Sequence, residues 1–309
     1  MRPGLPGTGL CDTAAPARRP ATSTGGAMEE FRDRVAVVTG GASGIGRALA
    51  GRFAEEGMHL VLADVEEAAL AAAVAELAAG GVRVIGVRAD VSVLGDVEAV
   101  RDRAVAEFGA VHLVCNNAGV AAGGIVGAPI ELWDWAMGVN LWGVVNGCHT
   151  FLPVLAEQDE AHIVNTASLA GLVGGAGLGI YCTTKFAVVG LSESLFAELA
   201  ELGSSVGVSV LCPGFVQTRI GQSDRNAPAA LSAWRESPQA SGTREMAMAL
   251  TAAGIEAATV ADAVLDAVRT RRFYVLPHLA AAVGATEGRA EWMRTGVPPV
   301  LDLQAALRP

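Results

Sequence analysis

From residue 34 onward, the sequence alternates short apolar runs with helix-forming segments, separated by turns that contain Gly, Asp, Asn or Pro. The apolar runs predict buried strands at residues 35–39, 58–63, 82–87, 111–115, 162–167 and 206–211. Strands that alternate with helices favour a parallel sheet covered by helices on both faces. No internal repeat or linker interrupts the pattern after residue 30, so we predict an α/β fold with a single doubly wound domain.

The turn after the first strand carries glycines at 40, 44 and 46 and leads into a predicted helix. Glycine at such places lets backbone N–H groups approach a pyrophosphate at the positive end of a helix. A glycine turn alone also fits a simple tight turn, but here Asp64 follows at the end of the next strand. A carboxylate there accepts hydrogen bonds from ribose hydroxyls and repels a 2′-phosphate. Positions 43, 65, 66 and 67 hold no Arg or Lys that could bind such a phosphate, so we predict NAD rather than NADP. The alternative is that Asp64 is simply a solvated acid at the end of a strand.

A second constellation follows the strand at 162–167. Ser168 comes at its carboxyl end, where open α/β sheets bind ligands. Tyr181 and Lys185 are four residues apart at the start of a predicted helix at 181–202, which places them on one helix face. An ammonium about 4 Å from a phenol favours the phenolate by roughly 4 kcal/mol before desolvation is subtracted. With help from a cationic cofactor, this pair predicts proton transfer at a carbonyl or alcohol carbon, although Y-x-x-x-K alone is typical of a helix-surface pair.

Together these residues resemble the short-chain dehydrogenase/reductase family. The resemblance is carried, in order along residues 30–276, by Thr39-Gly-x-x-x-Gly-Ile-Gly46, Asp90, Asn116-Asn-Ala-Gly119, Asn140, Ser168, Tyr181-x-x-x-Lys185, and Pro213-Gly214 with Thr218. It implies a Rossmann domain with a seven-stranded parallel sheet in the order 3-2-1-4-5-6-7, the last strand lying at 273–276. It also implies an NAD(P)-dependent enzyme that acts on CH–OH donors.

The resemblance implies a role for each matching residue. The implied catalytic set is Asn140, Ser168, Tyr181 and Lys185: Ser168 donates to the substrate oxygen, Tyr181 exchanges the proton, and Asn140 holds a water in a relay through Lys185. The implied cofactor-binding set is Gly40, Ser43, Gly44, Ile45, Gly46, Asp64, Asp90, Val91, Asn117, Tyr181, Lys185, Val216 and Thr218. The last two meet the carboxamide of the nicotinamide.

Composition excludes several other classes. A net charge of −10 argues against a nucleic-acid-binding surface. The uncharged windows at 135–156 and 163–184 contain many polar or glycine residues and fit a buried α/β core better than a membrane span. The five cysteines lack any metal-ligand spacing, and no secretory apolar region is present. We therefore predict free thiols, no metal site and a cytoplasmic protein.

Three segments flank or cover the predicted domain. Residues 1–27 are expected to be a disordered leader, or an over-extended start before Met28. Residues 28–280 form the predicted domain, with a substrate lid at about 219–254, and residues 281–309 are a C-terminal extension with no predicted role. Cys182 stands where the family commonly has Ser, Gly or Ala, and its expected role is packing.

The substrate is the least constrained part of the prediction. A glycine-rich loop at 169–180 leaves room beside Tyr181, and Phe215, Trp234, Met246 and Met248 are candidates for an apolar wall. We expect a hydrophobic secondary alcohol or ketone, such as a steroid, terpenoid or aromatic carbinol. The alternatives are an NADPH-dependent 3-ketoacyl reductase and a non-catalytic NAD-binding regulatory protein. The resemblance implies a homodimer or homotetramer packed through the helices around 132–155 and 181–202.

Overall fold

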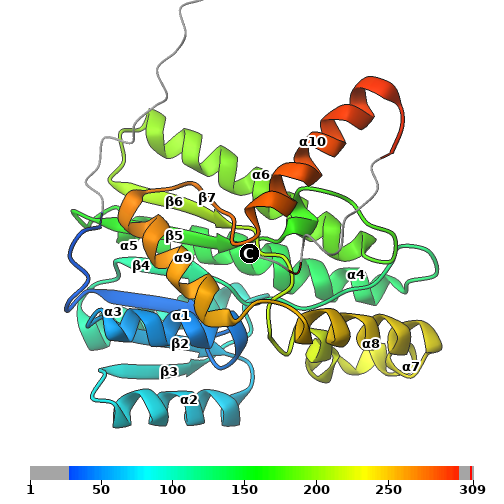
Figure 1. Ribbon diagram of the computed structural model, residues 1–309. Helices are drawn as coiled ribbons and strands as arrows, with labels where there is room; N and C mark the ends of the chain where they lie inside the picture. Colours follow the sequence, from blue (N-terminus) through cyan, green and yellow to red (C-terminus); the bar gives the residue numbers. More distant parts are fainter. Residues whose placement is uncertain (1–27, 299–306, 308–309) are drawn as a thin grey trace, which may run out of the picture.

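The strands form one parallel sheet in the order β3-β2-β1-β4-β5-β6-β7, as expected. The computed structural model describes residues 28–298 and 307 (Figure 1). The strands are β1 Val35–Thr39, β2 His59–Asp64, β3 Val84–Arg88, β4 Leu113–Asn116, β5 Ala161–Thr166, β6 Val206–Leu211 and β7 Tyr274–Val275. The predicted fold class and strand order are confirmed, with strand ends that differ from the prediction by no more than two residues.

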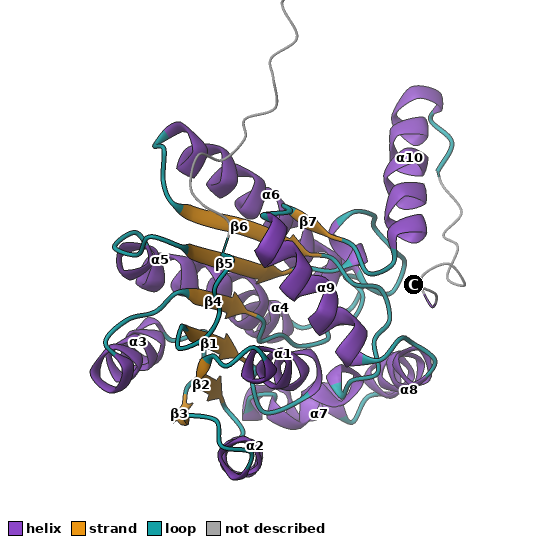
Figure 2. Ribbon diagram, turned by 60° about the vertical axis from the view of Figure 1, so that its left-hand side comes forward, coloured by secondary structure: helices purple, strands orange, loops and turns teal. Residues whose placement is uncertain are grey.

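Helices cover both faces of the sheet, so the hydrophobic core consists of two clusters, one on each face (Figure 2). One core is built with α1 Gly44–Glu55, α2 Glu67–Ala79 and α9 Ala257–Thr270. The other is built with α3 Leu94–Phe108, α5 Gly143–Leu155 and α6 Gly179–Glu201. The central strands β1, β4, β5 and β6 are buried along their whole length, which explains their continuous apolar runs.

The helix expected around 132–155 is divided by a π-helical turn. Helix α4 Ile130–Met137 is followed by the turn Gly138–Trp142 and then by α5. Asn140 lies in the middle of this turn and is fully buried. Single π turns inside α-helices are frequent at functional sites, and nothing in the residue pattern predicted this one.

The segment between β6 and α9 contains short helical turns followed by one longer helix. They are η3 Ile220–Asn226, η4 Ala229–Leu231, α7 Ser232–Arg235 and α8 Pro238–Ala252. Helices α7 and α8 lie to one side of the sheet, beyond the carboxyl ends of its strands (Figure 1). This is the segment predicted to be a lid, and that role stays a prediction.

The C-terminal part of the described chain forms a helix that the sequence did not predict. Helix α10, Leu279–Thr295, follows β7 and projects away from the sheet (Figure 1). The predicted leader at 1–27 lies outside the described residues, as does most of the chain after 298. Among the residues that are described, no helix is both long and apolar enough to cross a lipid bilayer.

Candidate active site

The glycine turn joins β1 to α1, as the sequence predicted. Gly40 and Gly44 have φ angles of 64° and 54°, a region that favours glycine. A Cβ on Gly46 would lie 2.1 Å from the Gly40 carbonyl oxygen, so no larger residue fits where α1 passes the turn. Thr218 closes the turn from the other side, because its Cγ2 lies 3.1 Å from the Cβ position of Gly44.

The N-terminus of α1 is open to an anion. Ser43 is its N-cap residue in an extended conformation and makes no side-chain cap bond, and the first turn contains no acidic residue. The first N–H groups of a helix have no partners within the helix and carry partial positive charge. The turn and the helix end therefore fit the pyrophosphate of a dinucleotide.

Asp64 lies at the end of β2, directly beside this turn. Its Oδ2 accepts a hydrogen bond from the backbone N–H of Ala42 at 3.0 Å, and its Oδ1 accepts one from Glu66 N–H at 3.0 Å. A carboxylate has about four acceptor positions, so further ones are open to ribose hydroxyls. Two backbone N–H groups therefore fix the orientation of the Asp64 carboxylate.

Asn117 joins the ends of β1 and β4, where the strand order reverses. Its Nδ2 donates to the Thr39 carbonyl at 3.0 Å, and its backbone N–H donates to Thr39 Oγ1 at 2.9 Å. Ligands of open α/β sheets bind at such a reversal. Asp90 and Val91 follow β3 in the chain. Asp90 Oδ1 accepts hydrogen bonds from the N–H and the hydroxyl of Ser92, and the Val91 carbonyl accepts one from Asn146 Nδ2.

Ser168 and Tyr181 meet at the carboxyl end of β5. Ser168 Oγ accepts from Ala170 N–H at 3.1 Å and lies 3.4 Å from the Pro213 carbonyl oxygen. Burial raises the pKa of Tyr181 to about 12, although a hydrogen bond with the Ser168 side chain acts in the opposite direction. The phenol is therefore protonated at neutral pH in the field of the protein's own groups.

Lys185 lies one helical turn further along α6 and is 2% exposed. Its Nζ donates to the Thr166 carbonyl at 2.8 Å and lies 5.6 Å from the ring centroid of Tyr181. Burial lowers the pKa of Lys185 to about 8. The spacing correctly placed both side chains on one face, but burial raises the pKa of the phenol and lowers that of the ammonium.

Asn140 faces Lys185 across Gly119. Its Oδ1 accepts from Val120 N–H at 2.8 Å, and its Nδ2 donates to the Val120 carbonyl at 3.0 Å and to Thr184 Oγ1 at 3.2 Å. A Cβ on Gly119 would lie 3.4 Å from Asn140 Oδ1 and 3.7 Å from Lys185 Nζ. The four residues of the predicted catalytic set thus come together around the ends of β4 and β5.

The candidates for an apolar wall are placed differently from one another. Trp234 packs against the same small apolar cluster as Tyr181, which contains Ala122, Leu132, Ala136, Ile180 and Leu231. Met246 is 48% exposed and Met248 is 41% exposed. Only Trp234 among these three therefore shares an apolar cluster with the tyrosine. Val216 is buried and pairs with Ile255, and Ile45 packs against the core of the α1 face.

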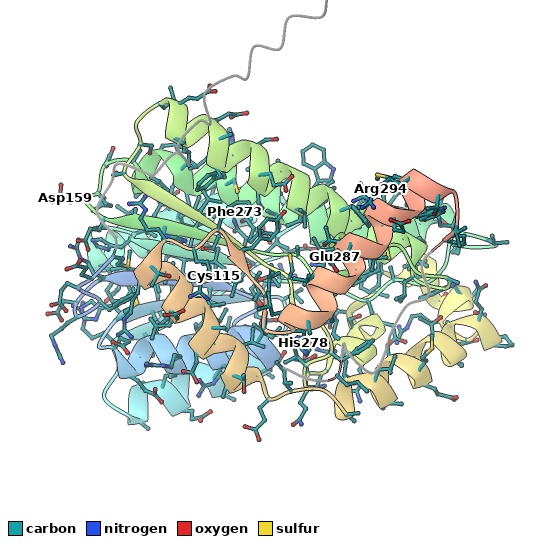
Figure 3. All side chains as sticks on the ribbon, turned by 45° about the horizontal axis from the view of Figure 1, so that its top comes forward. Cys115, Asp159, Phe273, His278, Glu287 and Arg294 are labelled. Carbon is teal, nitrogen blue, oxygen red and sulfur yellow. The ribbon has the colours of Figure 1, made fainter. Side chains whose placement is uncertain are left out.

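Two contacts near the site involve residues that the sequence did not point to. The fully buried His278 accepts a hydrogen bond at Nδ1 from Gly214 N–H at 3.0 Å and so fixes the turn after β6. Figure 3 labels His278 at the base of α10. Ser223 Oγ accepts from Ala121 N–H at 2.8 Å and ties η3 to the loop after β4. Neither residue belongs to a motif, and both act through tertiary contacts.

Among the described residues, the cysteines and acidic side chains form no metal centre. Cys115, Cys148, Cys182 and Cys212 are all free and buried. In the part of the chain that is described, no three His, Cys, Asp or Glu side chains form a group that could hold a metal ion.

Comparison with known proteins identifies the family. A sequence model of the family described as short chain dehydrogenase matches residues 34–229. The chain is 37% identical over 276 residues to 1-deoxy-11-beta-hydroxypentalenate dehydrogenase of Streptomyces exfoliatus, covering 87% of this chain and 92% of that protein. It is 41% identical over 191 residues to 3beta-hydroxysteroid dehydrogenase 2 of Eggerthella lenta, covering 61% of this chain and 73% of that protein.

A solved structure agrees with these relatives. The short chain dehydrogenase/reductase from Burkholderia phymatum in complex with NAD superposes with a TM-score of 0.85 at 43% identity, over 88% of this chain and 98% of that chain. The chain is therefore an oxidoreductase that belongs to the short-chain dehydrogenase family.

Proposed function

We propose that the protein transfers a hydride between NAD(H) and a hydrophobic secondary alcohol or ketone. The observation that carries this proposal is the cluster of Ser168, Tyr181 and the buried Lys185 at the end of β5, on the same edge of the sheet as the open N-terminus of α1. One half of this arrangement suits a proton exchange and the other suits an anionic dinucleotide.

The proposed roles follow from the contacts. When bound, the nicotinamide supplies or accepts the hydride. The Ser168 hydroxyl donates to the substrate oxygen, and the Tyr181 phenol gives its proton to that oxygen in reduction or takes it in oxidation. Lys185 holds positive charge next to the phenol, and Asn140 supports a proton relay from the opposite side of Gly119.

Two features support the choice of cofactor and substrate. Asp64 offers a backbone-oriented carboxylate for ribose hydroxyls, and the solved Burkholderia relative is a complex with NAD. The apolar cluster that Tyr181 and Trp234 share favours a hydrophobic substrate. Two relatives are named for a hydroxypentalenate and a hydroxysteroid, which are hydroxyl-bearing compounds.

The test is an alcohol panel with NAD, followed by NADH absorbance. We expect turnover with steroid, terpenoid or aromatic secondary alcohols, and a loss of roughly a hundredfold to ten-thousandfold in Tyr181→Phe with NAD affinity nearly unchanged. Turnover restricted to sugars or polyols would refute the hydrophobic substrate. Retained activity in Tyr181→Phe would remove the phenol from its role.

Adding a 3-ketoacyl thioester with NADPH and a measurement of NAD binding separates the alternatives. Faster reduction of a 3-ketoacyl thioester with NADPH would favour the ketoacyl reductase, and NAD binding without turnover of any alcohol would favour the regulatory protein. The homodimer or homotetramer and the cytoplasmic location stay predictions, which gel filtration and fractionation of the native host would check.

A further inference from the structure

An arginine from the predicted lid reaches the edge of the proposed cofactor site. Arg225 lies in η3, and its Nε donates to Glu66 Oε1 at 2.7 Å. Its Nη2 donates to the same oxygen, and Asn226 Nδ2 does so at 2.9 Å. The remaining terminal nitrogen of Arg225 donates to the carbonyls of Gln222 at 2.8 Å and Arg219 at 3.3 Å. All three nitrogens of the Arg225 guanidinium therefore donate hydrogen bonds.

This ion pair lies next to the residue proposed to hold the adenosine ribose. Glu66 is two residues beyond Asp64, and its N–H donates to Asp64 Oδ1. Burial opposes ionisation of Glu66, but hydrogen bonds from Arg225 and Asn226, with the charges of Arg225 and Arg219, hold the pKa of Glu66 below its usual value. Both partners are partly buried, with side chains 27% exposed in Arg225 and 23% exposed in Glu66.

The sequence showed no basic residue at the positions that follow Asp64. The fold supplies Arg225, which lies 159 residues after Glu66 in the chain. A guanidinium binds a phosphate through the same forked donors with which it binds a carboxylate. An arginine beside the ribose acid is also the usual means of accommodating a 2′-phosphate. The chain therefore holds a potential phosphate ligand beside an acid that selects against phosphate.

We propose that Glu66 is a cofactor-specificity residue: it occupies the Arg225 guanidinium and so denies NADP the arginine that would bind its 2′-phosphate. The inference rests on the dinucleotide site of the proposed function. Glu66 acts together with Asp64, which repels the phosphate directly. Removing the charge of Glu66 alone therefore shifts the preference towards NADPH without reversing it.

The experiment is a fluorescence titration of the full chain with NADH and with NADPH. Glu66→Gln removes the negative charge and frees Arg225. Glu67→Gln is the matched control, because Glu67 is the next residue, is exposed and changes the net charge equally. We expect the ratio of NADH affinity to NADPH affinity to fall about tenfold in Glu66→Gln, as one ion pair with a phosphate is gained, and to stay near the wild-type value in Glu67→Gln.

The double variant Glu66→Gln with Arg225→Met tests the route. We expect it to lose the gain in NADPH affinity, because the phosphate then has no guanidinium to bind. A gain that persists in the double variant, an equal gain in Glu67→Gln, or equal weakening of both cofactors in Glu66→Gln would each overturn the proposal. Circular dichroism melting accompanies each variant. If Glu66→Gln fails to fold, Arg225→Met alone decides, since tighter NADPH binding in that variant would also contradict the proposal.

The two proposals fail differently. If the wild-type chain binds neither dinucleotide, the proposed function is wrong. If NADH binds and the ratio does not respond to Glu66, the proposed function stands and this inference alone is wrong.

Discussion

Two glycines of helix α1 should respond in opposite directions to the same substitution. Gly46 lies in the first turn of α1, where a Cβ would approach the Gly40 carbonyl oxygen to 2.1 Å and Asn117 Nδ2 to 2.7 Å. Gly51 lies further along the same helix, and the nearest atom to its Cβ position is Nη1 of the flexible Arg47 side chain at 3.5 Å. Gly46→Ala should therefore destabilise the protein, whereas Gly51→Ala should stabilise it.

The geometry gives the size of both effects. A Cβ contact with a backbone oxygen rarely falls below 3.0 Å, so Gly46→Ala must move α1 from the turn by 0.9 Å, the difference between 3.0 and 2.1 Å. Overpacking of this kind costs about 1–3 kcal/mol, and weakening the Asn117 bond to Thr39 adds about 1 kcal/mol. We expect a loss of about 3 kcal/mol, or roughly 6–12 °C in Tm. In Gly51→Ala the helix gains about 0.5–1 kcal/mol, because alanine favours helix over glycine.

Thermal unfolding followed by circular dichroism measures both variants, and urea unfolding gives the free energies. Because the Gly46 contact holds the proposed phosphate-binding turn against α1, we also expect Gly46→Ala to weaken NAD binding while Gly51→Ala leaves it unchanged. The reasoning would be refuted if Gly46→Ala melted at or above the wild-type temperature, or if both substitutions shifted Tm in the same direction.

Three further predictions follow from buried ionisable groups. Burial lowers the pKa of Lys185 to about 8. Between that pH and the ordinary lysine pKa, the unfolded chain binds more protons than the folded chain, so the folded state becomes more stable as the pH rises. Urea titrations should show the unfolding free energy of the wild type rising by about 2 kcal/mol from about pH 7 to 9.5, relative to Lys185→Met. His162 is 1% exposed, and burial, aided by the charge of Arg271, lowers its pKa to about 3. Protons therefore favour the unfolded chain below the ordinary histidine pKa, and from about pH 7 to 5 the wild type should lose about 2 kcal/mol that His162→Gln does not lose. Burial raises the pKa of Cys182, so its thiol should react with a disulfide reagent at neutral pH more slowly than free cysteine does. Mass spectrometry would map the labelling, and labelling of Cys182 at the rate of free cysteine would contradict this prediction.

Much of the fold could be predicted because the relevant signals are local. A buried parallel strand needs a continuous apolar run, and β1 and β6 have the predicted limits. The glycines at 40, 44 and 46 predicted a strand-to-helix turn, and the structure has that turn between β1 and α1. Short loops between strands and helices also leave few topologies, so the strand order followed once the family resemblance was recognised.

The rest could not be predicted because it depends on which distant segments meet. The π turn at Asn140 lies in a segment, 132–155, for which the sequence analysis expected helix without such a turn. Arg225 and His278 act through contacts with residues 159 and 64 positions away. Each contact depends on the path of a connecting segment after β6 or β7, where no repeating pattern constrains the chain.

Burial shifts the pKa values of the site residues, and the spacing of those residues in the sequence cannot predict this shift. A lysine about 4 Å from a phenol favours the phenolate by roughly 4 kcal/mol, and a four-residue spacing makes such a pair look sufficient. Spacing does not say how far the two groups are removed from water, and here the pKa of Tyr181 rises to about 12 while that of Lys185 falls to about 8. The ammonium also donates to the Thr166 carbonyl and stays 5.6 Å from the ring centroid. The chain's own groups therefore keep the phenol protonated at neutral pH, which the four-residue spacing alone does not predict.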